Sequence, residues 1–458
     1  MRRLVIRAAL LLATLSVPAT RGESSAAPAP LPRRAFLGVV LAPADSAARA
    51  AAHLAPGDPG VLVQRVLPGS TAERAGIAGG DVIVALDTLA VRTPVQLTQA
   101  MARRHGGERA TLRWRHAGRP LERTLALAPQ PREQGDGWDV EYGQVASRAG
   151  WLRTLVTRPR TPGRHPALML IQGIGTFTVE TPLMGVDGYG AIVRDFASRG
   201  FVTMRVDKPG CGDSEGGPLR DVDFETQLDG FRAALAMLRS DPGVDPGRIL
   251  VFGHSMGGAW APLLADELPV RGIAVYGTLV RTWTEYLLEN DRRQGALGGQ
   301  SAAAIDSTLK LEARVCNYLW SEGLSPREMS ERHPELAPWV DSSMTNATYY
   351  AGCHYRFFQQ LAAKNLAAAW ARYPGYVLSL YGRSDFLSGE EDHALIARIV
   401  NQAHPGHARF QAIDGIDHAF RREATQAGSF ATWGQPGAPF DDRVVQALRA
   451  WSDEVVKE

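Results

Sequence analysis

The chain has 458 residues, of which 45% are hydrophobic and 21% are charged. This composition is typical of globular proteins, and the length suits two or three domains, so a fibrous or disordered protein is excluded. Lys and Arg total 50 against 48 Asp and Glu. Because no basic excess is available to neutralise phosphates, we expect no nucleic-acid partner.

The N-terminus has the pattern of an export signal. A start rich in arginine precedes the apolar stretch 8–17, which is too short to span a bilayer, and small residues follow up to Ala19. We therefore predict a signal peptide over 1–19, a flexible lead-in over 20–32, and a periplasmic or secreted protein. No later stretch reaches ~18 uninterrupted apolar residues, so we expect no transmembrane anchor after signal removal.

Three cysteines bear on redox state and metal binding. In an oxidising compartment Cys316 and Cys353 could form a disulfide that closes a loop of about 38 residues and contributes ~3 kcal/mol, or they could remain separate thiols. Cys211 would then be a buried free thiol. No clustered Cys and His spacing supports a structural zinc site, so we expect no metal.

Residues 33–128 are predicted to form a separate β-rich unit. The segment 68–87 has a short helical pattern with Ala-Gly-Ile, followed by Gly-Asp and an apolar strand, and 93–101 has helical spacing. With Phe36-Leu37-Gly38-Val39, these segments resemble a bacterial PDZ domain. The resemblance implies a groove in which free N–H groups of Phe36, Leu37, Gly38 and Val39 bind the C-terminal carboxylate of a partner peptide. The alternative is a β-rich spacer without a ligand.

The polar, breaker-rich stretch 129–137 is the predicted linker to a second domain, 138–458. In that domain strand patterns at 167–171, 201–207 and 248–252 alternate with helical patterns. This alternation predicts a doubly wound, mostly parallel α/β sheet.

The most informative motif is Gly253-His254-Ser255-Met256-Gly257, which lies between an apolar strand and a helix rich in Ala and Leu. Glycines two residues before and after a serine allow the sharp turn that exposes its hydroxyl at a helix N-terminus. In this context the whole pattern resembles the α/β-hydrolase fold and predicts Ser255 as a nucleophile.

The resemblance implies that an acid and then a histidine follow the nucleophile, each just past a strand end. Asp385 follows the strand 375–381, and His418 follows the last strand. We prefer them to other candidates nearby, which we interpret as solvated residues of a helix or loop: Glu390, Glu391, Asp392, His393, His404 and His407. We expect His254 to pack beneath the turn rather than to act as the base.

An oxyanion intermediate needs two N–H donors. The N–H of Met256 is one, and 172–175 should supply the second, from Ile174 or alternatively Gly173. Relatives often have His-Gly where this chain has Gln172-Gly173, which leaves the backbone donor intact.

An insertion over about 279–371 separates two strands of the predicted sheet. α/β-Hydrolases often carry a helical lid at this position, over the catalytic serine. Among the aromatic residues of this insertion are Trp283, Tyr286, Tyr318, Trp320, Trp339, Tyr349, Tyr350, Tyr355, Phe357 and Phe358. They would suit an apolar or ring-bearing substrate, or they only pack an added helical layer.

These patterns predict an exported serine hydrolase with Ser255, Asp385 and His418 as its triad and no cofactor. Carboxylic esters are the first substrate class. A peptidase is the alternative, in which Glu285, Glu289 or Asp291 of the insertion would hold a substrate amine. A PDZ scaffold with an inactive hydrolase domain is the non-enzymatic alternative.

Overall fold

The computed structural model describes residues 30–180, 188–435 and 437–457. The predicted signal peptide and most of the predicted lead-in lie outside the described residues. The chain divides into two compact units, Met1–Pro30 and Leu31–Glu458, and the second contains everything discussed below. Within the described ranges, no helix is both long enough and apolar enough to cross a membrane.

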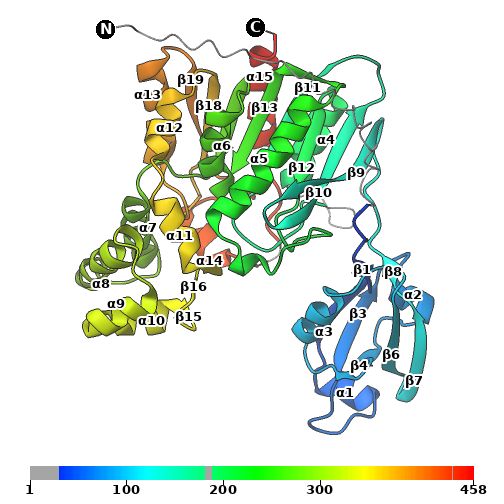
Figure 1. Ribbon diagram of the computed structural model, residues 1–458. Coiled ribbons are helices and arrows are strands. Elements are labelled where there is room, and N and C mark those ends of the chain that lie inside the picture. Colours follow the sequence, from blue (N-terminus) through cyan, green and yellow to red (C-terminus); the bar gives the residue numbers. More distant parts are fainter. Residues whose placement is uncertain (1–29, 181–187, 436, 458) are drawn as a thin grey trace, which may run out of the picture. The chain divides into compact units, whose positions relative to one another are not determined.

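The first part of this unit is a small β-rich region, blue to cyan in Figure 1. Its elements are β1 (Ala35–Phe36), β2 (Val39–Pro43), α1 (Ser46–Ala51), β3 (Val61–Val66), α2 (Thr71–Ala75), β4 (Val82–Leu86), β5 (Leu89–Ala90), α3 (Pro94–Met101), β6 (Arg109–His116), β7 (Arg119–Ala126) and β8 (Ala128–Pro129). The main sheet has the order β2-β3-β4-β6-β7, so β2 is an edge strand, while β5 pairs with β4 and β1 with β8. The Ser70 side chain caps α2, and Gly76 ends it at a φ of 77°, which glycine adopts readily.

The second part is built around one large sheet flanked by helices. Its elements are β9 (Trp138–Ser147), β10 (Gly150–Pro159), β11 (His165–Ile171), α4 (Gly188–Ser198), β12 (Val202–Val206), η1 (Leu219–Asp221), α5 (Phe224–Ser240), β13 (Val244–His254), α6 (Met256–Glu267), β14 (Gly272–Tyr276), β18 (Tyr376–Gly382), α13 (Glu390–Ala403), β19 (Ala408–Ile413), α14 (Gln426–Thr432) and α15 (Arg443–Val455). The strand order is β19-β18-β14-β13-β11-β12-β10-β9. The strands from β19 to β12 pair in parallel, whereas β10 and β9 are antiparallel. This is the doubly wound, mostly parallel sheet that the sequence predicts.

Two apolar cores cover the two faces of this sheet (Figure 1). Helices α5 and α6 contribute Phe231 and Trp260 to one core, and α4 and α15 contribute Phe196 and Trp451 to the other. Strands buried on both faces need apolar residues at successive positions rather than alternation. The run 167–171 therefore has no polar residue, and its strand carries the following loop to the sheet edge.

The insertion between β14 and β18 is mostly helical, as predicted. Its elements are α7 (Trp283–Leu297), α8 (Ala302–Val315), η2 (Cys316–Ser321), α9 (Pro326–Arg332), η3 (Pro334–Leu336), α10 (Ala337–Ser343), β15 (Met344–Thr345), β16 (Tyr349–Tyr350), β17 (Cys353–His354), α11 (Tyr355–Ala362) and α12 (Leu366–Arg372). The sequence did not predict the three short strands, which form an antiparallel sheet of their own in the order β15-β16-β17. Thr282 starts α7 with a capping box, in which its side chain and that of Glu285 bond each other's backbone N–H groups.

Candidate active site

The turn between β13 and α6 holds Ser255 in a backbone conformation that L-residues rarely adopt, with φ 56° and ψ −125°. The flanking glycines make this turn possible. A Cβ atom at Gly257 would lie 2.1 Å from the carbonyl oxygen of Ile171, and one at Gly253 would lie 2.6 Å from that of Gly257. The close packing of strand and helix therefore requires glycine at both positions and presents the Ser255 hydroxyl at the start of α6.

Asp385 and His418 lie together beyond the ends of β18 and β19. The Nδ1 atom of His418 is 2.7 Å from Oδ2 of Asp385. Asp385 is fully buried, and it also accepts hydrogen bonds from the Ser388 hydroxyl at 2.6 Å and from the N–H groups of Leu387 and Ser388. An ionised carboxylate is an acceptor only, so these bonds orient Asp385 toward the histidine.

Asp385 and His418 each stabilise the charged form of the other. Burial alone would raise the pKa of Asp385, but attraction to His418 and hydrogen bonds from His418 and Ser388 lower it to about 2. Burial alone would lower the pKa of His418, but the charge and hydrogen bond of Asp385 outweigh it and raise the pKa above 6.5. The pair therefore favours an ionised Asp385 and a higher pKa of His418, as suits the predicted base.

The predicted base and the predicted nucleophile face one cavity. Ser255 and His418 both line a pocket of about 530 Å³, and Gly277 lies beside the histidine. A Cβ atom at Gly277 would lie 2.8 Å from Nδ1 of His418 and 3.2 Å from Oδ2 of Asp385. A larger residue at that position would push the pair apart.

The predicted oxyanion donors line the same pocket. Ile174 and Met256 are both lining residues, and within the described part of the chain neither N–H has a hydrogen-bond acceptor. Gly173 packs against Ser255, because a Cβ atom at Gly173 would lie 3.1 Å from the Ser255 hydroxyl oxygen. Two N–H groups without acceptors beside a serine suit the binding of an oxyanion.

Comparison with known proteins identifies the family. A family model described as serine aminopeptidase, S33, matches residues 185–425, more than half of the chain. The chain belongs to this family of α/β hydrolases. A PDZ-domain model matches residues 62–116, which confirms the resemblance found in the N-terminal region.

Individual relatives match shorter stretches. The quorum-quenching protein AidA of Acinetobacter baumannii is 33% identical over 101 residues, which are 22% of this chain and 31% of that protein. Polyketide transferase ATR5 of Stachybotrys chlorohalonatus is 31% identical over 156 residues, 34% of this chain and 48% of that protein. The chain thus spans less than half the length of these curated relatives.

Solved structures with a similar fold are more distant. The hyperthermophilic esterase from the archaeon Pyrobaculum calidifontis is 18% identical with a TM-score of 0.42, covering 71% of this chain and 87% of that one. Est1E from Butyrivibrio proteoclasticus is 12% identical with a TM-score of 0.41, covering 69% and 99%.

The pocket of this S33 hydrolase is mainly apolar. The aromatic residues Trp283, Tyr286, Tyr350 and Phe358 of the insertion line it, together with Phe177, Tyr189 and Trp433 from outside the insertion. The other insertion aromatics do not line it, and Trp320, Trp339 and Phe357 are buried in the core beneath. Some of these aromatic residues therefore line the pocket, whereas others pack within the added helical layer.

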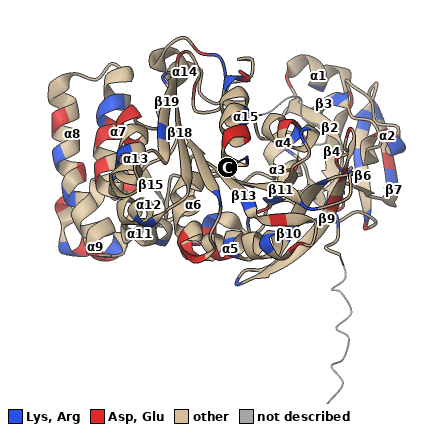
Figure 2. Cartoon of the chain, turned by 90° about the horizontal axis from the view of Figure 1, so that it is seen from above, with Lys and Arg blue, Asp and Glu red and all other residues tan. Residues whose placement is uncertain are grey.

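Figure 2 shows acidic and basic segments interspersed along α7. The acidic residues of this helix differ in their surroundings. Glu285 belongs to the capping box, and Glu289 pairs with Arg281 and Arg293. Asp291 alone of the three predicted amine ligands lines the pocket. Behind it lies the buried Glu312, whose pKa is far above its usual 4.5 because of burial and a hydrogen bond to Asp291.

Two residues interpreted as solvated are in fact buried, and this part of the sequence prediction is wrong. Asp392 accepts the N–H groups of Val280 and Arg281 at 2.9 and 3.0 Å, and its carboxylate pairs with the Arg281 side chain. His393 accepts the N–H of Thr278 at 3.0 Å. Both side chains hold the chain segment that leaves β14, where one wall of the pocket begins.

Glu391 is exposed and Glu390, His404 and His407 are half-buried. His254 is buried beneath the turn, as predicted, and contacts Tyr189 and the backbone of His418. Sequence reasoning missed Tyr189 and also Lys208, which reaches the loop after β11. The signal available for Lys208 was a lysine directly after the predicted strand 201–207.

The cysteines are three separate buried thiols, so the structure has the second of the two predicted arrangements and not the Cys316–Cys353 bridge. Burial raises the pKa of Cys211 and Cys353 to about 11 and that of Cys316 to about 12. In the described part of the chain, no three His, Cys, Asp or Glu side chains gather in a way that could hold a metal ion.

The predicted peptide-binding loop lies between β1 and β2. Gly38 has a φ of 69°, and a Cβ atom there would lie 2.1 Å from the Ser70 side chain, so glycine is required. The carbonyls of Leu37 and Gly38 accept backbone hydrogen bonds from Ala72 and Leu67. Neither residue's N–H has an acceptor among the described residues, and the adjacent strand β2 is at the sheet edge.

Proposed function

We propose that this S33 hydrolase cleaves carboxylic esters through an acyl-enzyme intermediate. The observation that carries the proposal is the contact of 2.7 Å between His418 and Asp385, with His418 and Ser255 lining one pocket. A serine hydroxyl is a weak nucleophile unless a base accepts its proton, and the base needs an acid to orient it. The family match supports the hydrolase chemistry.

In the proposed reaction the Ser255 hydroxyl attacks the substrate carbonyl, and His418 takes its proton while Asp385 holds the ring. The carbonyl oxygen becomes an oxyanion bound by the N–H groups of Met256 and Ile174. His418 then protonates the leaving alcohol, and a water molecule hydrolyses the acyl-enzyme by the same steps in reverse. The apolar walls favour an apolar acyl group or a ring as substrate.

The test compares purified wild type with Ser255→Ala and His418→Ala on p-nitrophenyl esters of increasing acyl length. Ser255→Ala should abolish turnover and labelling by a fluorophosphonate probe, and His418→Ala should lower kcat by ~10³-fold or more with the fold retained. Undiminished labelling of the Ser255→Ala protein would remove Ser255 from the mechanism. Turnover near the wild-type level in His418→Ala would assign the base to another residue.

An aminopeptidase is the second candidate, and Asp291 is the observation that favours it. Glu312 remains protonated at neutral pH and donates its proton to a hydrogen bond with Asp291, so the pair carries one negative charge at the pocket wall. One negative charge beside an apolar pocket suits a substrate ammonium group. If the enzyme is a peptidase, aminoacyl-anilides are better substrates than esters, and Asp291→Asn impairs their hydrolysis while leaving p-nitrophenyl acetate unaffected.

We further propose that the protein is exported and that its PDZ region binds C-terminal peptides. The basic and apolar N-terminus supports export, and the unoccupied N–H groups beside the edge strand β2 support peptide binding. Peptides ending in an apolar residue with a free carboxylate should bind in the micromolar range, roughly −8 kcal/mol. Equal affinity for the same peptide with an amidated C-terminus would contradict a carboxylate-binding loop.

A further inference from the structure

Lys208 is a buried cation directed at the loop that supplies an oxyanion donor. It lies two residues after β12 and is 2% exposed. Its Nζ atom donates a hydrogen bond of 2.7 Å to the carbonyl oxygen of Gly173 and lies 5.1 Å from the ring centroid of Phe177. Gly173 and Phe177 both line the pocket that contains Ser255.

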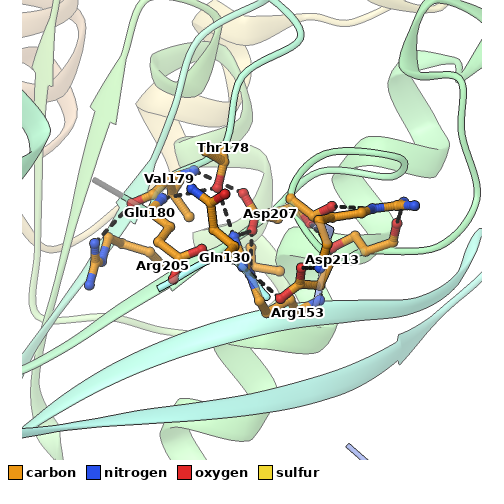
Figure 3. A network of polar contacts seen from close by, with 12 residues as sticks. Gln130, Arg153, Thr178, Val179, Glu180, Arg205, Asp207 and Asp213 are labelled. Atoms are coloured by element: carbon orange, nitrogen blue, oxygen red, sulfur yellow. Dashed lines mark hydrogen bonds and ion pairs between the residues drawn. The ribbon is translucent and has the colours of Figure 1, made fainter. Parts of the chain in front are cut away.

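The charge of Lys208 has no carboxylate partner within the described part of the chain. Its neighbour Asp207 is occupied, because its carboxylate pairs with Arg153 and accepts the N–H of Val179 at 2.8 Å (Figure 3). Arg153 also pairs with Glu180 and Asp213, so this network is satisfied without the lysine. Burial lowers the pKa of Lys208 to about 8.

Burying an unpaired ammonium is costly, and an apolar side chain would fill the same space without that cost. Packing therefore does not explain a lysine at this position. Its strongest polar contact is with the Gly173 carbonyl, which indicates that the contact itself is what the lysine provides.

The geometry of the peptide bond connects this contact to catalysis. The carbonyl of Gly173 and the N–H of Ile174 belong to one peptide unit, and the bond is trans. In a trans peptide these two groups point in opposite directions. Lys208 holds the carbonyl from one side, so it fixes the direction in which the Ile174 N–H points. A cation bonded to a carbonyl also polarises the amide and strengthens its N–H as a donor.

Two further hydrogen bonds hold the neighbouring residues of this loop. The Gln172 side chain donates to the carbonyl of Val206 at 3.1 Å, and the N–H of Gly173 donates to the Tyr189 hydroxyl at 3.3 Å. These contacts place Gly173 but leave the rotation of the following peptide to Lys208.

We propose that Lys208 is a positioning residue that sets the Gly173–Ile174 peptide for binding the oxyanion. This inference rests on the proposed function, because it assumes that Ser255 generates an oxyanion beside Ile174. Lys208 acts before the chemistry begins and touches no substrate atom.

The test compares Lys208→Met with Lys310→Met, which makes the same chemical change at an exposed position on α8. The substrate is p-nitrophenyl acetate. We expect Lys208→Met to lower kcat by ~10-fold to 100-fold with KM within about 3-fold of wild type, because the contact matters once the oxyanion forms. Lys310→Met should behave like wild type.

Two inhibitors separate positioning from general damage. A trifluoromethyl ketone reacts with Ser255: Oγ bonds to the carbonyl carbon, the hydroxyl proton passes to His418, and the carbonyl oxygen becomes an oxyanion. The matching methyl ketone forms little of this adduct. In Lys208→Met the Ki of the trifluoromethyl ketone should rise by the same factor by which kcat falls, while that of the methyl ketone stays within about 3-fold.

A Lys208→Met protein with kcat and both inhibition constants within about 3-fold of wild type would overturn the proposal. Equal loss of affinity for both ketones would also overturn it, since that pattern indicates a structural role alone. If Lys208→Met does not fold, Lys208→Gln undergoes the same comparison with the same expected difference between the ketones.

Ser255→Ala keeps the two hypotheses apart. If Ser255→Ala retains turnover, the proposed function fails whatever Lys208 does. If Ser255→Ala is inactive and Lys208→Met is unchanged, only the positioning role fails.

Discussion

The Nε2 atom of His254 lies 2.9 Å from the backbone carbonyl oxygen of His418. A carbonyl only accepts hydrogen bonds, so Nε2 carries the proton and Nδ1 accepts the hydroxyl of Tyr189 at 2.6 Å. Burial lowers the pKa of His254 to about 3, which keeps the ring neutral. The residue before Ser255 thus holds the backbone of the predicted base, and this hydrogen bond links the two loops.

We expect His254→Phe, which keeps the ring volume but removes both hydrogen bonds, to lower kcat by about 10-fold with little change in KM. One hydrogen bond that orients a catalytic group is worth about 1 kcal/mol or slightly more. Steady-state kinetics on p-nitrophenyl acetate measures the effect. Tyr189→Phe serves as the milder variant, and a His254→Phe enzyme as fast as wild type would mean that the loop of His418 needs no such support.

Asp385→Asn should lower kcat by on the order of 10³-fold or more and should also change the pH profile. In wild type Asp385 raises the pKa of His418, so activity should be lost below a pKa that lies above 6.5. Without that carboxylate, burial lowers the pKa of His418 and is opposed only by the weaker attraction of Asp417. The acid limb of kcat/KM should therefore move to lower pH in the variant, and a limb that stays in place would assign the titration to another group.

Gly173→Ala should remove most activity although its backbone does not require glycine. The new Cβ atom would lie 2.7 Å from Cβ of Ser255 and 3.1 Å from its hydroxyl oxygen. We expect kcat/KM to fall by ~10²-fold. The melting temperature should be nearly unchanged, because the loop of Gly173 and the turn of Ser255 separate only locally. The control is Gly247→Ala, where the nearest atom would be a flexible Asp245 oxygen at 3.3 Å. Equal activity in the two variants would be evidence against close packing at Ser255.

Glu312→Gln should stabilise the protein at pH 8. The folded state raises the pKa of Glu312 above the unfolded value of 4.5, so ionised Glu312 opposes folding, and this penalty is absent below pH 4.5 and grows as pH rises. Glutamine is neutral and still donates to Asp291. We expect a gain of about 2 kcal/mol in the free energy of unfolding at pH 8 and little gain at pH 4.5, measured by urea denaturation. A gain that is equal at both pH values would rule out the ionisation of Glu312 as its cause.

Thiol titration of the non-reduced protein should find no rapidly reacting group in the native state and three after denaturation. All three cysteines are buried, and burial raises their pKa values. The thiolate is the reactive form, so alkylation of the native protein should be slow. A single thiol after denaturation would show that two cysteines are bridged.

The parallel strands β11, β13, β14 and β18 could be predicted because each contains a short apolar run between breakers. The antiparallel strands β9 and β10 were not predicted, because polar residues are interspersed along both of them. Ser255 was predictable because the surrounding turn requires glycine at Gly253 and Gly257. The positions of Asp385 and His418 followed from strand order, and the structure brings them together, although their catalytic roles remain predictions. The short strands β15 to β17 were not predictable, since two-residue strands leave no periodic pattern.

The misjudged residues share a physical cause. Asp392 and His393 begin a helix, and acidic residues at a helix start are usually solvated. Only the tertiary structure shows that the chain leaving β14 passes over them and donates its N–H groups to their side chains. Lys208 and Tyr189 likewise act on loops far away in the sequence, and no local pattern marks such contacts.

The two walls of the pocket come from different parts of the chain. Ser255, His418 and the predicted oxyanion donors follow the ends of sheet strands. Trp283, Tyr286, Asp291, Tyr350 and Phe358 belong to the insertion. Substitutions in the insertion can therefore alter which molecules the pocket accepts while Ser255 and His418 stay in place. Natural variation or directed evolution confined to 283–358 should produce enzymes of different selectivity that share one set of reactive atoms, and this stretch is the part of the gene to randomise first.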